Sequence, residues 1–415
     1  MNDAAKLEVE GRLTDALNDA IRCRATAPFC HMAAHIRKNK LEKPGAAPAG
    51  DVAAVKLLPE VQAYLEEHAI ERKLGEVVSE LLGRAGVPDD LPGLLAAKVG
   101  LLETKSLLPL LQMPGFWEKE GGAPLLGRNA GFLTSERGVP EAWRERVAKW
   151  PSLCDGAVDP SSDVCDDEAA LRIFEKDADR TFVDAMHKQL YIGLLMRVWP
   201  ENRDYNQGLG YTCSLLMLLF DEATIVRLLT AFTRSDKYTP GYWRAAPDAY
   251  VRDAWVYGRL LKEREPEVAA LLAVCVPESY ASKWFNGLCL HVLPYEALFP
   301  FVEQFIVEGY GFLFKFALAL IGRVKGGLLQ CAQTQVNTLY EHLRLDAKLY
   351  PDDKDGGAWF VEMVEEAKAV ELDVAAIASM RKEEEERLAE HRRKVAEREA
   401  EYSDDEIVFS DEEDD

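Results

Sequence analysis

The sequence contains no Gly-x-x-x-x-Gly-Lys-Ser/Thr, the loop that cradles phosphates in many nucleotide-binding proteins. It contains no Cys-x-x-Cys pair, and its 8 cysteines are scattered, so we expect reduced thiols rather than a disulfide framework. There is no run of about eighteen apolar residues that could cross a membrane. The polar N-terminus does not resemble a secretory signal. These absences predict a soluble intracellular chain that binds no nucleotide of its own.

Basic residues are in the minority. The 415 residues include 49 Lys and Arg against 71 Asp and Glu, which gives a formal net charge of −22. Nucleic acids and anionic membrane surfaces bind basic patches, so we exclude both as main partners. The cysteines and the 7 histidines do not show the spacing of a zinc motif, and we expect no metal and no cofactor.

Apolar residues make up 48% of the chain and recur with a helical period in long stretches, with little β-type alternation. This pattern predicts an all-α protein. Shifts in composition divide the chain further. The predicted parts are a helical hairpin (1–43), a linker (44–56), a second helical repeat (57–104), a linker (105–130), a main helical domain (131–345), charged C-terminal helices (346–400) and an acidic disordered tail (401–415).

The two N-terminal helical parts look like repeats of one another. Residues 12–21 align with residues 73–82, and each segment is followed by a proline-containing turn and a second short helix. A helix pair this small cannot bury its apolar face alone. We therefore expect each copy to pack against another copy, either within the chain or across a dimer.

Two short motifs in the main domain carry the side chains of greatest chemical interest. The first contains Asp177 and Arg180, and the second contains Tyr205, Gln207 and Gly208. An arginine offers a planar, permanently charged fork to phosphoryl oxygens, and a glutamine amide can orient an attacking water. Because Asp177 and Arg180 are three residues apart, they share a face of a helix, and the carboxylate can hold the guanidinium.

The main domain resembles the TBC domain, which acts on Rab GTPases. Several landmarks of that family occur in the family's order from Gly138 to Gly309. They are Gly138-Val139-Pro140 with Trp143 and Arg144, the I-x-x-D-x-x-R motif with Ile173, Asp177 and Arg180, the Y-x-Q-G motif with Tyr205, Gln207 and Gly208, then Lys283-Trp284-Phe285, Leu293-Pro294 and Glu303 to Gly309.

The resemblance implies a GTPase-activating protein in membrane trafficking, with no substrate site of its own. It would complete the active site of a GTP-bound Rab-family small GTPase, with Arg180 as an arginine finger and Gln207 as a glutamine finger. The residues that the resemblance places in supporting roles are Asp177, Thr181, Tyr205, Gly208 and Ile173.

The chain departs from the family pattern at two places near these residues. Three residues rather than two separate Ile173 from Asp177, and Asp204 precedes Tyr205 where the family usually has a small residue. A carboxylate at position 204 can either reshape the loop or repel a phosphate. The alternative that remains open is a non-catalytic TBC scaffold that binds a Rab or an anchoring partner.

Residues 57–104 resemble the RIIa-type dimerisation and docking domain. The resemblance rests on an apolar helix followed by an acidic proline turn, with Leu74, Val78, Leu81, Leu82 and Pro88-Asp89-Asp90. It implies a homodimer through residues 1–104 and a groove for an amphipathic anchoring helix. Docking modules of this type often occur in cilia and flagella, so we expect a cytoplasmic location at endomembranes or at a cilium or flagellum.

The last residues of the chain are strongly acidic. Ser403 and Ser410 each precede an acidic run, which suits phosphorylation by an acidophilic kinase of the casein-kinase-two kind. A tail that serves only solubility is the alternative.

Overall fold

The computed structural model describes residues 3–41, 59–84, 86–104, 109–120, 139–155, 161 and 163–404, and for residues 399–404 it describes the backbone alone. Within these ranges all regular structure is helical and no strand occurs, which confirms the predicted all-α class. No helix in these ranges combines the length and the apolar character that a membrane span requires. The predicted linker 44–56 lies outside the described residues, as do Gly138, Ser410 and the chain beyond Asp404.

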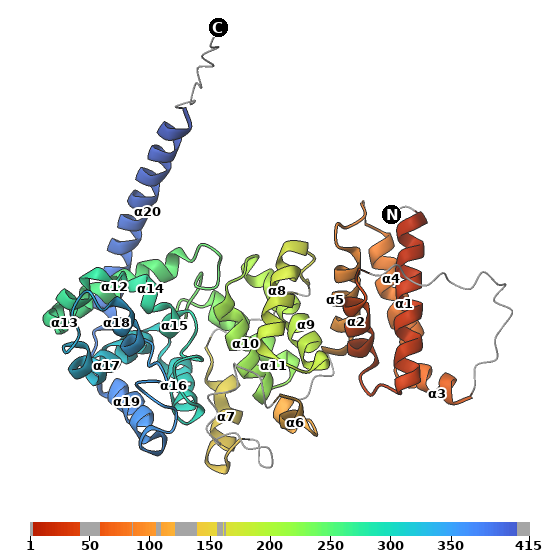
Figure 1. The fold of residues 1–415 in the computed structure, drawn as a ribbon, viewed down its shortest axis with the longest axis horizontal. Helices are drawn as coiled ribbons and strands as arrows, with labels where there is room; N and C mark the ends of the chain where they lie inside the picture. Colours follow the sequence, from red (N-terminus) through yellow and green to blue (C-terminus); the bar gives the residue numbers. More distant parts are fainter. Residues whose placement is uncertain are drawn as a thin grey trace, which may run out of the picture.

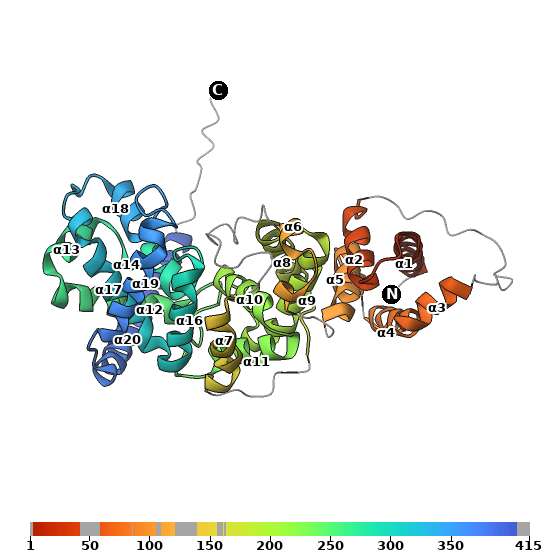
Figure 2. The same cartoon turned by 90° about the horizontal axis from the view of Figure 1, so that it is seen from below.

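The helices follow one another along the long axis of the molecule (Figure 1). The N-terminal helices are α1 (Asp3–Cys23), α2 (Pro28–Lys38), α3 (Pro59–Glu67), α4 (Ile70–Leu82) and α5 (Leu91–Thr104). The central elements are η1 (Leu110–Gln112), α6 (Phe116–Glu120), α7 (Glu141–Leu153), α8 (Glu168–Thr181), α9 (Ala185–Asn202), α10 (Gln207–Leu219) and α11 (Glu222–Arg234). Seen at right angles in Figure 2, the N-terminal helices still lie beyond α8 and α9 at one end.

The C-terminal elements form the other end of the molecule. They are α12 (Asp248–Arg264), α13 (Pro266–Leu271), η3 (Leu272–Val274), α14 (Pro277–Tyr280), α15 (Ser282–Phe285), α16 (Tyr295–Glu308), α17 (Tyr310–Leu328), α18 (Val336–Leu343), η4 (Lys354–Gly357), α19 (Ala358–Ala369) and α20 (Val374–Asp404). Figure 1 shows α20 leaving the body of the molecule as a long single helix. It ends at Asp404, four residues beyond the limit predicted for the charged helices.

The two aligned N-terminal segments lie in α1 and α4, and the helices that follow them, α2 and α5, pack against each other. The carboxylate of Glu103 on α5 accepts hydrogen bonds from the backbone N–H groups of Phe29 (2.9 Å) and Cys30 (3.2 Å), so it caps the N-terminus of α2. Helix α5 also packs against α9 of the main domain. The two predicted repeats thus pack against each other within the chain, and pairing across a dimer stays a prediction.

The predicted linker 105–130 contains ordered structure in its described part, and that portion of the prediction is wrong. The turn before α6 uses Gly115 at a φ of 72°, a conformation that suits glycine. Helix α6 then buries Phe116 and Glu120. The Glu120 carboxylate accepts hydrogen bonds from the backbone N–H groups of Val183 (2.7 Å) and Asp184 (2.9 Å). The glycines and prolines therefore separate short packed elements at these positions.

Candidate functional site

Helix α8 carries the first motif, and its two faces differ. Phe174, Asp177 and Thr181 are buried against the rest of the domain, whereas the side chain of Arg180 is 67% exposed. The predicted supporting residue Ile173 is 45% exposed and faces solvent. Phe174, three residues before Asp177, lies on the same buried face, and the supporting role of Ile173 stays a prediction. Phe174 thus restores the two-residue spacing that Ile173 lacks.

The buried carboxylate of Asp177 contacts side chains from both motifs. The Tyr205 hydroxyl donates to its Oδ2 at 2.7 Å. Its Oδ1 faces Arg180 Nη1 at 3.4 Å and Gln207 Nε2 at 3.5 Å. The two nitrogen atoms, from helices α8 and α10, therefore both lie within 3.5 Å of one oxygen atom.

The remaining bonds around Asp177 hold this carboxylate in place. The Thr181 hydroxyl donates to the Asp177 backbone carbonyl at 2.7 Å, and the ring of Tyr205 packs edge-on against Phe174 at 5.0 Å between centroids. Burial raises the pKa of Tyr205 well above its usual value, so its hydroxyl keeps the proton that it donates. Thr181 and Tyr205 thus both contact Asp177, and their supporting role stays a prediction.

The second motif begins helix α10. Asn206 is the N-cap residue, and its side chain accepts a hydrogen bond from the Gly208 N–H at 3.0 Å. Gly208 lies in the first helical turn, where a Cβ atom would press on the Asn286 backbone carbonyl and approach Trp243 Nε1 to 3.0 Å. Asn206 lies at a position that the Y-x-Q-G motif leaves variable, and an asparagine directly before a helix is a common capping signal.

The side chain of Asp204 binds backbone N–H groups of two loops. Its Oδ1 accepts a hydrogen bond from the Tyr205 N–H at 2.8 Å, and its Oδ2 accepts one from the Ala245 N–H at 3.0 Å. Both carboxylate oxygens are therefore engaged by backbone donors. Asp204 thus fixes the conformation of the loop, and its repulsion of a phosphate stays a prediction.

A pocket of about 250 Å³ adjoins the second motif. Gln207, Tyr211, Lys283, Asn286 and His291 are among the residues that line it. The rings of Tyr211 and His291 meet edge-on at 4.1 Å between centroids. Burial raises the pKa of Tyr211 to about 12, so at neutral pH its hydroxyl is a hydrogen-bond donor beside the two motifs.

Two residues of the later sequence landmarks, Trp284 and Gly309, have roles in packing. Trp284 is fully buried, and its indole N–H donates to the Leu343 carbonyl at 3.0 Å. Gly309 has a φ of 70° where α16 ends, and a Cβ atom there would overlap the Lys237 backbone. These landmarks therefore maintain the fold that positions the two motifs.

In the N-terminal hairpin the structure brings together three side chains that the sequence pattern does not group. Asp19, Cys23 and His31 place one possible ligand atom each within 4.8 Å of one another. The signal available in the sequence was two pairs of residues four apart, Asp19 with Cys23 and His31 with His35, on consecutive helices.

Comparison with known families identifies the central part of the chain. Residues 163–329 match the family model of the Rab-GTPase-TBC domain. This segment is a TBC domain. It contains both motifs and lies within the range 131–345 predicted for the main domain.

The proteins that the chain resembles include TBC proteins. The chain is 27% identical over 169 residues to growth hormone-regulated TBC protein 1 of Xenopus tropicalis, which covers 37% of this chain and 48% of that protein. It is 26% identical over 122 residues to human TBC1 domain family member 10B, which covers 28% of this chain and 15% of that protein. The chain thus spans about half the length, or less, of these relatives.

A solved structure also aligns with the chain. It is the TBC domain of Skywalker/TBC1D24 from Drosophila melanogaster, with 11% identity and a TM-score of 0.36 over 71% of this chain and 91% of that chain. The RIIa-type resemblance of residues 57–104 stays a prediction.

Proposed function

We propose that this protein is a GTPase-activating protein for a Rab-family small GTPase, and that Arg180 and Gln207 enter the nucleotide site of that partner. The observation that carries the proposal is the shared oxygen of Asp177, which lies 3.4 Å from the Arg180 guanidinium and 3.5 Å from the Gln207 amide. One buried carboxylate thus presents, from two helices, the two groups that GTP hydrolysis needs.

The chemistry of the two groups is complementary. The guanidinium of Arg180 neutralises charge that develops on the transferring phosphoryl group. The amide of Gln207 orients the attacking water, a task that a glutamine performs in many GTPases themselves. Because the Arg180 side chain is 67% exposed, it can leave Asp177 and enter a partner without unpacking α8.

The proposal is tested by single-turnover GTP hydrolysis with a panel of GTP-loaded Rab proteins and the full chain. We expect Arg180→Ala to reduce the stimulated rate by about 10³-fold or more, as for other arginines supplied in trans. Arg180→Lys should restore little, because lysine lacks the planar fork. The matched control is Arg172→Ala, which removes an exposed arginine from the same helix and should leave the rate unchanged.

Asp177→Asn tests the positioning role of the carboxylate. A misplaced Arg180 should lower the stimulated rate by about 10²-fold while Rab binding persists. Asp179→Asn, at an exposed carboxylate of the same helix, is the control. Equal stimulation by wild type and Arg180→Ala would contradict the proposal. Binding of every Rab without faster hydrolysis would instead favour the non-catalytic scaffold.

A further inference from the structure

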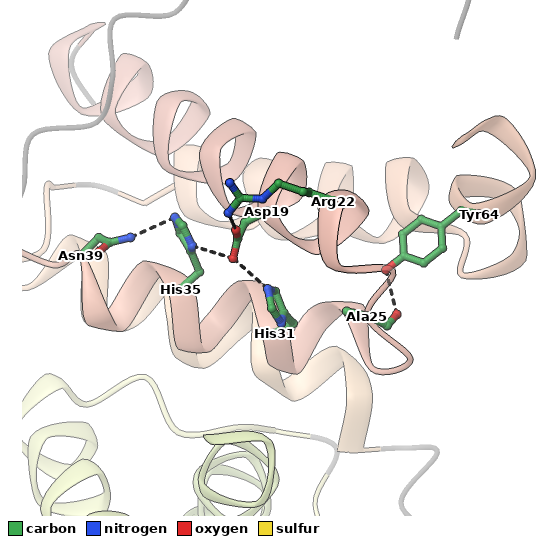
Figure 3. Close-up of polar contacts among 7 residues, drawn as sticks. All are labelled: Asp19, Arg22, Ala25, His31, His35, Asn39 and Tyr64. Atoms are coloured by element: carbon green, nitrogen blue, oxygen red, sulfur yellow. Dashed lines mark hydrogen bonds and ion pairs between the residues drawn. The ribbon is translucent and has the colours of Figure 1, made fainter. Parts of the chain in front are cut away.

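The hairpin of α1 and α2 brings four side chains with metal-ligating atoms together. Asp19 and Cys23 are four residues apart on α1, and His31 and His35 are four apart on α2, so each pair shares one helix face. Asp19, Cys23 and His31 each have a ligand atom within 4.8 Å of the others. Figure 3 shows Asp19 pointing from α1 between the two imidazoles of α2.

Asp19 is the centre of the group. Its Oδ2 lies 2.9 Å from His31 Nε2 and 3.1 Å from His35 Nδ1, while its Oδ1 pairs with Arg22. Both oxygens of the carboxylate therefore face donor groups, and Oδ2 is the atom directed at His31.

His35 is oriented by a neighbour on its own helix. The Asn39 amide Nδ2 lies 2.9 Å from His35 Nε2. Since an amide nitrogen can only donate, His35 Nε2 accepts and the ring proton is on Nδ1, which faces Asp19. His35 thus donates to the carboxylate, as the hydrogen-bonding partners of metal ligands commonly do.

The turn between the two helices is also fixed. The Tyr64 hydroxyl of α3 donates to the Ala25 backbone carbonyl at 2.8 Å (Figure 3). Arg24, next to it, has a φ of 48°. Helix α3 therefore stabilises the turn between α1 and α2. This turn places Cys23, at the end of α1, near His31 of α2.

We propose that Asp19, Cys23 and His31 bind a divalent transition metal of the zinc class, with His35 and Asn39 orienting the carboxylate. A thiolate, an imidazole and a carboxylate are ligands that Zn²⁺ accepts together, whereas Mg²⁺ and Ca²⁺ prefer oxygen alone. Cys23 and His31 remain accessible at the surface, so the fourth position is open to water.

Binding requires two proton changes. The Cys23 thiol releases its proton to solvent and ligates as the thiolate. The proton on His31 Nε2 is exchanged through solvent for one on Nδ1, so the ring stays neutral and the metal takes the place of that proton between Nε2 and Asp19 Oδ2. The other carboxylate oxygen keeps its ion pair with Arg22. The bound metal would then join α1 to α2 and stabilise the hairpin by mass action.

The first test is zinc titration of the full, reduced, metal-stripped chain against a chromophoric chelator. We expect one saturable equivalent per chain. Cys23→Ser and His31→Asn should each lower the affinity more than tenfold, and His35→Gln should lower it by about 10- to 100-fold. Cys331→Ser and His68→Asn are the matched controls and should bind zinc as the wild type does.

Cobalt binding gives an absorption signal that requires Cys23 to ligate the metal. A cysteine with a purely structural role would not affect that signal. The wild-type chain and Cys331→Ser should show thiolate-to-cobalt charge-transfer absorption, and Cys23→Ser should not. No saturable metal binding by the wild type, or unchanged binding in Cys23→Ser and His31→Asn, would overturn the proposal.

A measurement on the unmodified chain covers the case in which a variant fails to fold. At free zinc about ten times the dissociation constant, the free Cys23 thiol falls about tenfold, and its alkylation by iodoacetamide should slow by the same factor. Alkylation of Cys331 in the same sample should keep its rate. Equal rates at Cys23 with and without zinc would also overturn the proposal.

Discussion

At the scale of single residues, Asp177 and Gly208 shape the site in opposite ways. Asp177 acts through what its side chain binds, because its two oxygens contact three side chains from α8 and the start of α10. Gly208 acts through the side chain that it lacks, since the Asn286 carbonyl occupies the space that a Cβ atom would need. The close approach of residue 286 to α10 depends on this glycine.

Replacing Gly208 with alanine should therefore destabilise the domain. The obstructing atom is a backbone carbonyl that cannot swing away, so we expect a loss of about 1–3 kcal/mol in the free energy of unfolding. Urea unfolding followed by circular dichroism measures it. The control is Gly322→Ala in the interior of α17, where no atom lies within 4 Å of the added methyl. The free energy of unfolding of that variant should rise by about 0.5–1 kcal/mol. A similar decrease in both variants would contradict the explanation.

At the scale of helices, α20 shows how a charged sequence can still pack. Arg381 lies over the ring of Tyr310 at 3.9 Å and contacts both carboxylate oxygens of Asp253 at 2.9 Å. Asp253, on α12, is fully buried and also accepts a hydrogen bond from Tyr242. The first turns of α20 are thus bound to the domain, whereas residues near 393 carry exposed ion pairs along the helix.

Arg381→Ala should cost far more stability than a matched change further along the helix. It removes a partner from a buried carboxylate, which typically costs about 3–5 kcal/mol, and Arg252 at 2.7 Å from Asp253 keeps the loss near the lower figure. Arg393→Ala removes an exposed pair and should cost less than about 1 kcal/mol. Chemical denaturation of both variants distinguishes them, and equal losses would show that α20 is not anchored at Asp253.

At the scale of the whole molecule, the N-terminal helices and the TBC domain share an interface. Arg37 of α2 forms an ion pair with Glu175 of α8 at 3.2 Å and donates to Gln189 Oε1 of α9 at 2.9 Å. Helix α5 packs against α2 on one side and α9 on the other. Helix α8, which carries Arg180, is therefore in direct contact with the N-terminal helices through Arg37.

Arg37→Ala should loosen this interface. Losing hydrogen bonds to a charged group should lower the free energy of unfolding by about 2 kcal/mol, and hydrogen exchange should accelerate in α2, α5 and α9 together. Arg24→Ala, at an exposed ion pair of the same N-terminal part, should change stability by less than about 1 kcal/mol and leave exchange unchanged. Faster exchange in α2 alone would contradict a shared interface.

Several features of the site were open to prediction from the sequence because they depend on local spacing. Asp177 and Arg180 are three residues apart, so any helix places them on adjacent turns, and the structure brings their side chains to 3.4 Å. The helical period likewise predicts the all-α class, which the structure confirms. The sequence could not show which of two adjacent residues packs against Tyr205. Only the burial seen in the structure shows that this residue is Phe174 and not Ile173.

The sequence by itself determined the helices and the chemical groups that they carry, because periodicity and side-chain identity are local properties. Only the tertiary structure decided which groups meet. It brought Gln207 to Asp177 across 30 residues. It placed Asp204 on backbone donors and gathered Asp19, Cys23 and His31 on one face of a hairpin. Such encounters depend on how helices pack, and a sequence pattern within one helix contains no information about its neighbour's orientation.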